Sequence, residues 1–222
     1  MVSSADRRLF LARQRIVELV LTWESVAAKV RWICLTTAPG GPAALLLPHW
    51  RVLHKEMMSR LGVPIEYIGV RTSEGKGVLH ILAAAQPERG RSWSEMCHYQ
   101  WVGEAWGRIH GAPNGNTIRE FSFGTEGRMS HYMTFKQVPH VVGFFRSRKG
   151  FSGGVLGRSV YLDLRRWILP EWRVVVENGA ELARLSPRWG AMQRAWRSLL
   201  RSRQCEVDGR VLVVVDGRLE AV

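Results

Sequence analysis

A regular succession of strand and helix patterns between residues 31 and 123 constrains the fold of this chain most strongly. Residues 31–37 (RWICLTT) are rich in β-branched and aromatic types and stop at Ala-Pro-Gly-Gly-Pro, a run that neither a strand nor a helix tolerates. Over residues 43–61 the apolar side chains recur at helical spacing, and Gly62 and Pro64 then end the pattern. The sequence therefore predicts a strand followed by a helix.

Three further strands and a helix follow. Residues 64–72 and 78–85 are strand patterns joined by the short connection 73–77, so they predict a β-hairpin. Residues 92–110 predict a helix, because a Ser-x-x-Glu capping box opens a helical apolar repeat that ends at Gly-Ala-Pro. Residues 116–123 alternate apolar and polar types, which predicts a fourth strand.

The resulting order β-α-β-β-α-β predicts an α+β fold of the ferredoxin-like type, an antiparallel sheet with helices on one face. We expect three parts, namely an N-terminal helical arm (1–30), this sheet domain (31–167), and an extension with a basic helix and a small terminal β-hairpin (168–222). Another helix is predicted near residues 125–136. Residues 144–154 (FFRSRKGFSGG) predict a basic loop that either touches phosphates and bases or is an ordinary surface loop.

The charge of the chain favours a polyanionic partner. Lys and Arg number 32 against 19 Asp and Glu, a formal net charge of +13, and only five of the 32 are lysines. Arginine makes planar, bidentate contacts with phosphate, so nucleic acid is the partner class that this excess favours. A GC-rich genome would also replace Lys by Arg, but it would not create the net excess.

Other sequence features predict a cytoplasmic protein. No stretch approaches the roughly 18 uninterrupted apolar residues of a membrane-spanning helix, and the first residues lack the apolar core of a signal peptide. Cys34, Cys97 and Cys205 are scattered and form no CxxC pair, which fits a reducing compartment. We therefore expect cytoplasmic localisation and no membrane partner.

His80 is the first residue with potential chemistry. It lies midway along the predicted strand 78–85, where alternation places His80 and Leu82 on one face of the sheet. A lone histidine on a strand is more often structural. Here, however, Glu74 in the preceding connection and Glu66 on the neighbouring strand offer carboxylates near the imidazole, which is the beginning of a divalent-metal site.

Tyr132 is the second such residue. Lys136 follows it by one helical turn on the same face of the predicted helix. A phenol is a poor nucleophile until a cation or a polarised substrate assists it, so a lysine at this distance is chemically sensible. On spacing alone, an ordinary helix tyrosine with its ring in the core is the more frequent arrangement.

Several short motifs together resemble a known family. These are ICLTT (33–37), YIGVRTSEGKGVLHIL (67–82), WGRIHGA (106–112), SHYMTFK (130–136) and the basic segment 144–154. In this order they resemble rolling-circle replication initiators of the HUH endonuclease superfamily, and more closely the phage and plasmid replication-associated proteins that carry an EGxGVxH motif. The resemblance covers about residues 31–167, and its order agrees with the β-α-β-β-α-β frame.

The resemblance implies a metal-dependent endonuclease that nicks and rejoins single-stranded origin DNA through a 5′-phosphotyrosyl intermediate. It implies Tyr132 as the nucleophile, Lys136 as the basic residue beside it, and His80 with Glu74 as ligands of Mg²⁺ or Mn²⁺. A separate helicase and a host polymerase would be partners, because the sequence has no GxxxxGK[ST] motif. The basic residues expected to bind DNA around this site are Arg71, Lys76, Arg146, Arg148 and Lys149.

The sequence departs from the family at the motif that names it. The superfamily has two histidines separated by one hydrophobic residue, whereas this chain reads His80-Ile81-Leu82. One imidazole and a carboxylate still suit a hard cation, with reduced affinity. His110 and His131 are alternative ligands, although His110 also fits a charge partner at the end of its helix. A non-catalytic nucleic-acid-binding module on the same frame is therefore the alternative function.

Overall fold

The chain divides into two compact units, which we call the sheet unit (Val26–Phe151) and the terminal unit (Met1–Ser25 with Ser152–Val222). Each is described by itself. The computed structural model describes residues 16, 19–20, 22–24, 26–39, 41–73, 77–86, 92–121, 141–147, 156–168 and 186–222.

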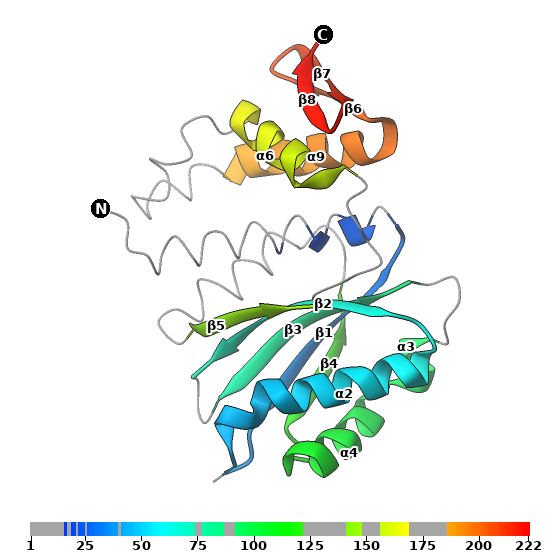
Figure 1. The fold of residues 1–222 in the computed structure, drawn as a ribbon, viewed down its shortest axis with the longest axis vertical. Coiled ribbons are helices and arrows are strands. Elements are labelled where there is room, and N and C mark those ends of the chain that lie inside the picture. Colours follow the sequence, from blue (N-terminus) through cyan, green and yellow to red (C-terminus); the bar gives the residue numbers. More distant parts are fainter. Residues whose placement is uncertain are drawn as a thin grey trace. The chain divides into compact units, whose positions relative to one another are not determined.

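The sheet unit is built on a five-stranded antiparallel sheet with the order β4-β1-β3-β2-β5 (Figure 1). Its strands are β1 (Lys29–Thr36), β2 (Ile65–Thr72), β3 (Val78–Ala85), β4 (Asn116–Glu120) and β5 (Val141–Arg146). The order of the first four strands is that of a ferredoxin-like fold, which confirms the predicted fold class. β5 lies outside this frame, beside β2.

Strand β5 corrects the prediction of a loop that starts at residue 144. Phe144, Phe145 and Arg146 pair in register with β2 and extend the sheet by one edge strand. The Phe145 ring packs against Tyr67, with ring centroids 6.0 Å apart. Two consecutive phenylalanines thus place one ring on each face of the sheet. From composition alone, this edge strand could not be distinguished from a loop.

The helices of the sheet unit begin and end close to the predicted residues. The 3₁₀ turn η1 (Ala43–Leu45) leads into α2 (Leu46–Leu61), which ends at the left-handed Gly62. The predicted helix over 92–110 is two helices. The Ser92 capping box opens the single turn α3 (Trp93–Met96), and α4 (Tyr99–His110) starts again after His98, whose side chain caps it.

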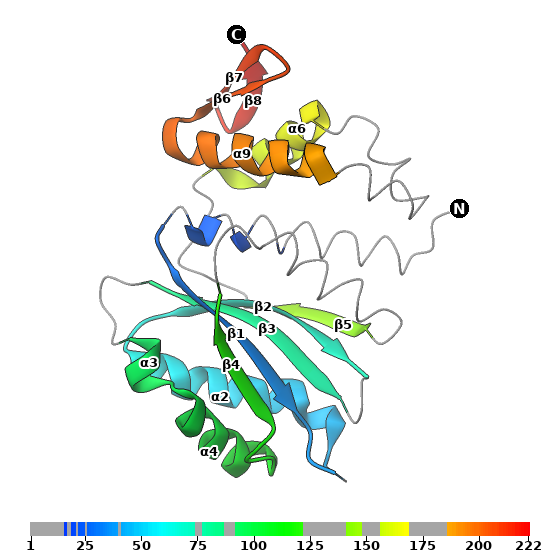
Figure 2. The same ribbon diagram turned by 180° about the vertical axis from the view of Figure 1, so that it is seen from behind.

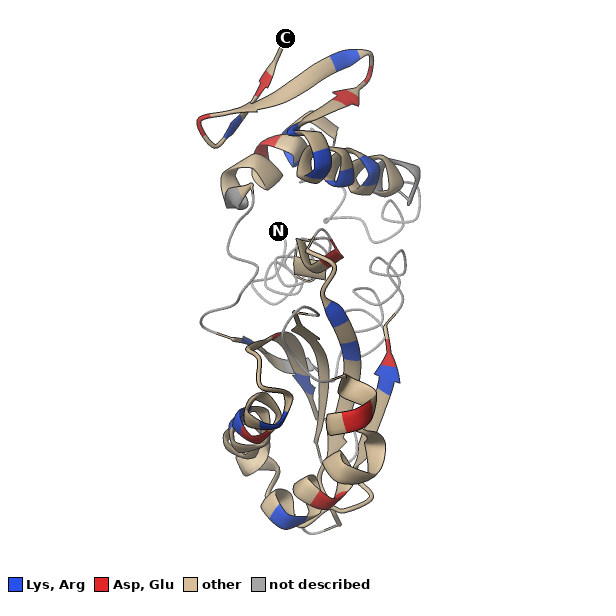
Figure 3. Ribbon diagram, turned by 90° about the vertical axis from the view of Figure 1, so that its right-hand side faces the viewer, with Lys and Arg blue, Asp and Glu red and all other residues tan. Residues whose placement is uncertain are grey.

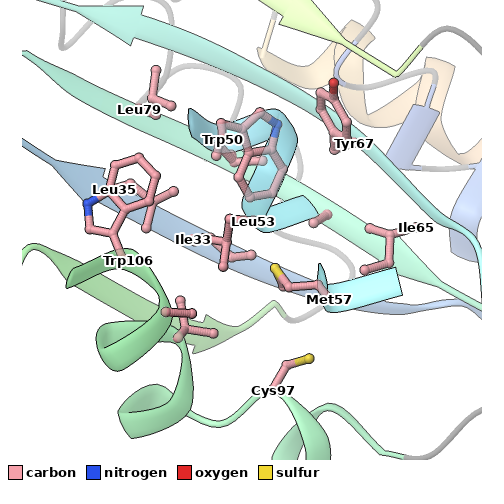
Figure 4. Close-up of a cluster of buried hydrophobic side chains, with 14 of the residues drawn as sticks. Ile33, Leu35, Trp50, Leu53, Met57, Ile65, Tyr67, Leu79, Cys97 and Trp106 are labelled. Carbon is pink, nitrogen blue, oxygen red and sulfur yellow. The ribbon is translucent and has the colours of Figure 1, made fainter. Parts of the chain in front are cut away.

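Helices α2 and α4 cover one face of the sheet (Figures 1 and 2). The core between them contains fully buried Trp50, Leu53 and Met57 from α2 and Trp106 from α4 (Figure 4). The sheet contributes every second residue of its central strands to this core, namely Ile33, Leu35, Ile65, Tyr67, Leu79, Ile81 and Ala83. Because side chains alternate along a strand, His80 and Leu82 point to the opposite face.

The terminal unit has its own core and its own sheet. It contains α6 (Gly157–Ile168), α9 (Ser186–Ser202) and a three-stranded antiparallel sheet of β6 (Gln204–Val207), β7 (Arg210–Val215) and β8 (Arg218–Ala221). The predicted basic helix is confirmed as α9, and arginines recur along it (Figure 3). The prediction of a terminal hairpin was wrong by one strand: the structure has three strands here instead of two. Both Asp-Gly pairs, at 208–209 and 216–217, have positive φ and form tight turns between these strands.

The boundaries of the two units differ from the predicted parts. Helix α6 shares a buried cluster with α9 and the small sheet, including Tyr161 and Trp196, so residues 157–168 belong to the terminal unit. Arg218 donates to Asp163 of α6 over 2.7 Å and holds the pKa of this carboxyl below its usual value. Glu24 pairs with Arg197 of α9 at 2.7 Å, which joins the N-terminal segment to the same unit. Among the described residues, no helix is long and apolar enough to cross a membrane.

The packing of β5 on β2 gives a testable prediction. A Cβ on Gly69 would lie 2.5 Å from Cζ of Phe145 and 2.8 Å from the carbonyl oxygen of His80. We expect Gly69→Ala to lower the free energy of unfolding by about 1–3 kcal/mol, because the crowded ring and backbone must shift. Urea denaturation measures the loss. Gly143→Ala on β5 is the control, because nothing lies within 4 Å of its added Cβ; equal losses in the two variants would contradict this packing.

Candidate functional site

The candidate site lies on the face of the sheet opposite α2 and α4, here called the His80 face. The register of the strands places side chains on this face in two adjacent rows. From β4 to β5, the first row is Thr117, Cys34, His80, Val70 and Phe144, and the second is Arg119, Trp32, Leu82, Ile68 and Arg146.

Cys34 and His80 are direct cross-strand partners at the centre of the first row. The Sγ atom of Cys34 lies 3.3 Å from Nδ1 of His80. His80 is only 5 % exposed, whereas Cys34 is half-buried. The Trp32 ring lies beside them, with its centroid 6.5 Å from that of His80. Cys34 is therefore the more accessible residue of the pair.

Exposure on the His80 face increases toward one edge. Val70, Leu82 and Ile68, on β2 and β3, are buried. Four neighbouring side chains of β1 and β4 on this face are half-buried or exposed. We call this accessible part the β1–β4 strip; it consists of Trp32, Cys34, Thr117 and Arg119. The strip joins an aromatic ring, a thiol, a hydroxyl and a guanidinium on one surface.

The predicted DNA-binding residues that the structure describes lie on different faces. Arg71 pairs with Leu79, whose side chain is in the core under the helices, so Arg71 points away from the His80 face. Arg146 is exposed on the His80 face, at the β5 edge of the sheet. Arg119, at the β4 edge, was missed by the sequence analysis, because only the register aligns it with Trp32. Lys76, Arg148 and Lys149 lie outside the described residues.

Glu66 is on the His80 face but too far from His80 for the two side chains to bind the same metal ion. It stands four residues before Val70, the direct neighbour of His80, which corresponds to about 13 Å along the strand. The other residues expected around His80, namely Glu74, His131, Tyr132 and Lys136, lie outside the described part of the chain. Their convergence on the imidazole stays a prediction.

His110, an alternative ligand in the sequence analysis, lies on the helical side of the sheet. Its ring stacks on Trp106, its Nδ1 is 2.8 Å from Nδ1 of His49, and its Nε2 is 3.3 Å from Oγ1 of Thr37. It therefore cannot join His80. Burial and the nearby His49 lower the pKa of His110, so the neutral imidazole is favoured and His110 is not the charged partner of its helix end.

Among the described residues, few metal-ligating side chains lie near His80. Within the described ranges, no group of three or more His, Cys, Asp and Glu side chains comes together. His80 has one direct neighbour with a ligating atom in its row, the thiol of Cys34.

Comparisons with known proteins find no relative: no family model, no curated protein and no solved structure matches the chain.

The histidines of the helical side give a prediction about pH. Burial lowers the pKa of His54 and of His110 below 6.5 in the folded chain. The unfolded chain then binds more protons than the folded chain, so the free energy of unfolding should fall as the pH decreases below about 6.5. Urea denaturation from pH 8 to pH 5 measures this slope.

His110→Gln should have a shallower slope than the original chain. Comparing the two at pH 8, where the imidazoles are neutral, removes the contribution of lost packing. If His110→Gln had the same slope as the original chain, the lowered pKa of His110 would be contradicted.

Proposed function

We propose that the chain is a rolling-circle replication initiator that nicks and rejoins single-stranded origin DNA. One observation carries this proposal: His80 lies midway along the central strand of a ferredoxin-like sheet, on the face that α2 and α4 leave uncovered. This is the position that the family resemblance requires of its metal-binding histidine. The net charge of +13 supports a polyanionic substrate.

In the proposed reaction, the phenol of Tyr132 loses its proton and attacks a phosphodiester phosphorus. A bond from phosphorus to the tyrosine oxygen forms while the bond to the 3′ oxygen breaks, and the 3′ oxygen takes up a proton. Lys136, four residues further along the chain, stabilises the phenolate. Mg²⁺ or Mn²⁺, held by His80 and Glu74, would supply charge stabilisation to the phosphate oxygens.

The phosphotyrosyl link explains how one protein both nicks and rejoins. The link conserves the energy of the broken bond, so attack by a free 3′-hydroxyl reseals the strand and releases Tyr132. The free 3′ end meanwhile primes synthesis by a host polymerase, and a separate helicase unwinds the template. We place this activity in the cytoplasm.

The β1–β4 strip is the DNA contact that the described residues favour. Arg119 is exposed at its edge and Trp32 lies beside it in the same row. A cation for the phosphates next to a ring for the bases is the combination that binds single strands. A strand on this surface would pass over Cys34 and approach His80.

A second candidate function is a nucleic-acid-binding module without catalysis. Leu82 stands where the family has its second histidine, on the same face as His80, and it is fully buried. An apolar side chain there supplies no ligand. The same surface and charge would then bind single-stranded nucleic acid without cleaving it.

A covalent adduct decides between these two functions. Incubated with labelled single-stranded origin DNA and Mn²⁺, the chain should form a complex that survives denaturation, and Tyr132→Phe should abolish it while leaving DNA binding intact. An unchanged adduct in Tyr132→Phe would assign the nucleophile elsewhere. No adduct with either Mn²⁺ or Mg²⁺ would favour the binding module.

The role of the strip is tested by the salt dependence of binding. Arg119→Ala should weaken binding of a single-stranded oligonucleotide and reduce the slope of log K against log salt by about 0.7–1, as expected for one lost phosphate contact. Fluorescence anisotropy at several salt concentrations measures this slope. Arg51→Ala, an exposed arginine on α2, is the matched control. Equal effects of the two variants would place the DNA elsewhere.

A further inference from the structure

The contact between Cys34 and His80 joins two strong metal ligands in a rigid part of the molecule. The two residues face each other across β1 and β3, the central pair of the sheet, with Sγ and Nδ1 3.3 Å apart. Both strands continue in register for two residues or more on either side of the pair. The backbone pairing therefore holds the two residues directly opposite each other.

This separation fits two ligands of one tetrahedral ion. With bonds of about 2.3 Å to sulfur and 2.0–2.1 Å to nitrogen, the two ligand atoms of a tetrahedral zinc site lie about 3.6 Å apart. The observed 3.3 Å is close to this value, so a small rotation of the side chains is sufficient. A sulfur and an imidazole nitrogen select Zn²⁺ and similar ions, whereas Mg²⁺ prefers oxygen ligands.

Cys34 differs from the other two cysteines of the chain. Cys97 and Cys205 are both buried, and burial raises the pKa of their thiols to about 12 and about 11. These two thiols stay protonated and packed in their cores. Cys34 is half-buried, on the β1–β4 strip, and it directly faces an imidazole.

We propose that Cys34 and His80 together bind a thiophilic divalent ion of the Zn²⁺ type, with the remaining positions open toward the β1–β4 strip. On binding, the Cys34 thiol releases its proton and the sulfur becomes a thiolate ligand. The open positions take water or the oxygens of a DNA phosphate. The assignment of this ion to DNA chemistry rests on the proposed function, where the ion on Cys34 and His80 would take the place of the Mg²⁺ or Mn²⁺ on His80 and Glu74. Cys34 then provides the ligand that Leu82 cannot.

Cobalt absorption tests this site without DNA. Titrating the metal-free full-length chain with Co²⁺ should produce thiolate-to-cobalt charge-transfer absorption that saturates at one ion per chain. Cys34→Ser should abolish this absorption, His80→Gln should abolish or strongly weaken it, and Cys205→Ala should retain it. No absorption in the original chain, or full absorption in Cys34→Ser, would overturn the proposal.

Two further measurements keep the result interpretable. Circular dichroism verifies that each variant is folded, and Cys34→His should still bind Co²⁺ by calorimetry while losing the thiolate absorption. Adding Zn²⁺ to the original chain should release a proton that Cys34→Ser does not release. If the cobalt absorption appears but no DNA adduct forms, the metal site stands and the nickase proposal fails. If the original chain shows no cobalt absorption and Cys34→Ser forms the DNA adduct in normal yield, the nickase proposal stands and the metal site at Cys34 and His80 fails.

Discussion

The alternation of side chains along β3 is the constraint on which the rest of the sheet unit depends. Leu79, Ile81 and Ala83 enter the core beneath α2 and α4, so His80 and Leu82 must lie on the other face. A shift of one residue in the pairing would turn the imidazole toward the helices and move the apolar set to the His80 face. The same packing that stabilises the fold therefore orients its chemistry.

The pairing of β3 with β1 then determines the surroundings of His80. Cys34 becomes its direct partner, and Trp32, Thr117 and Arg119 become the accessible neighbours on the β1–β4 strip. Arg71, only a few residues away in sequence from the β3 strand, is directed to the helical side by the same alternation. The nucleic-acid surface that we propose is thus a product of register rather than of proximity in sequence.

Local patterns predicted most of the ferredoxin-like frame, because periodicity, Gly62 and the Ser92 capping box are local signals. They did not predict strand β5, whose two phenylalanines face opposite sides, or the break of the helix near His98. Nor did they associate Cys34 with His80 or find Arg119, because both depend on pairing between distant strands. The predicted domain boundaries were wrong for the same reason, because α6 packs against α9 and the small sheet and therefore belongs to the terminal unit.

The central claim is that the His80 face, along β1 and β4, receives single-stranded nucleic acid. Photocrosslinking with an oligonucleotide that carries halogenated pyrimidines, followed by mass spectrometry of the peptides, tests it most directly. Our account predicts crosslinks at Trp32 and neighbouring positions of β1 and β4, reduced by unlabelled competitor. Crosslinks confined to α2 and α4, or to the terminal unit, would contradict it.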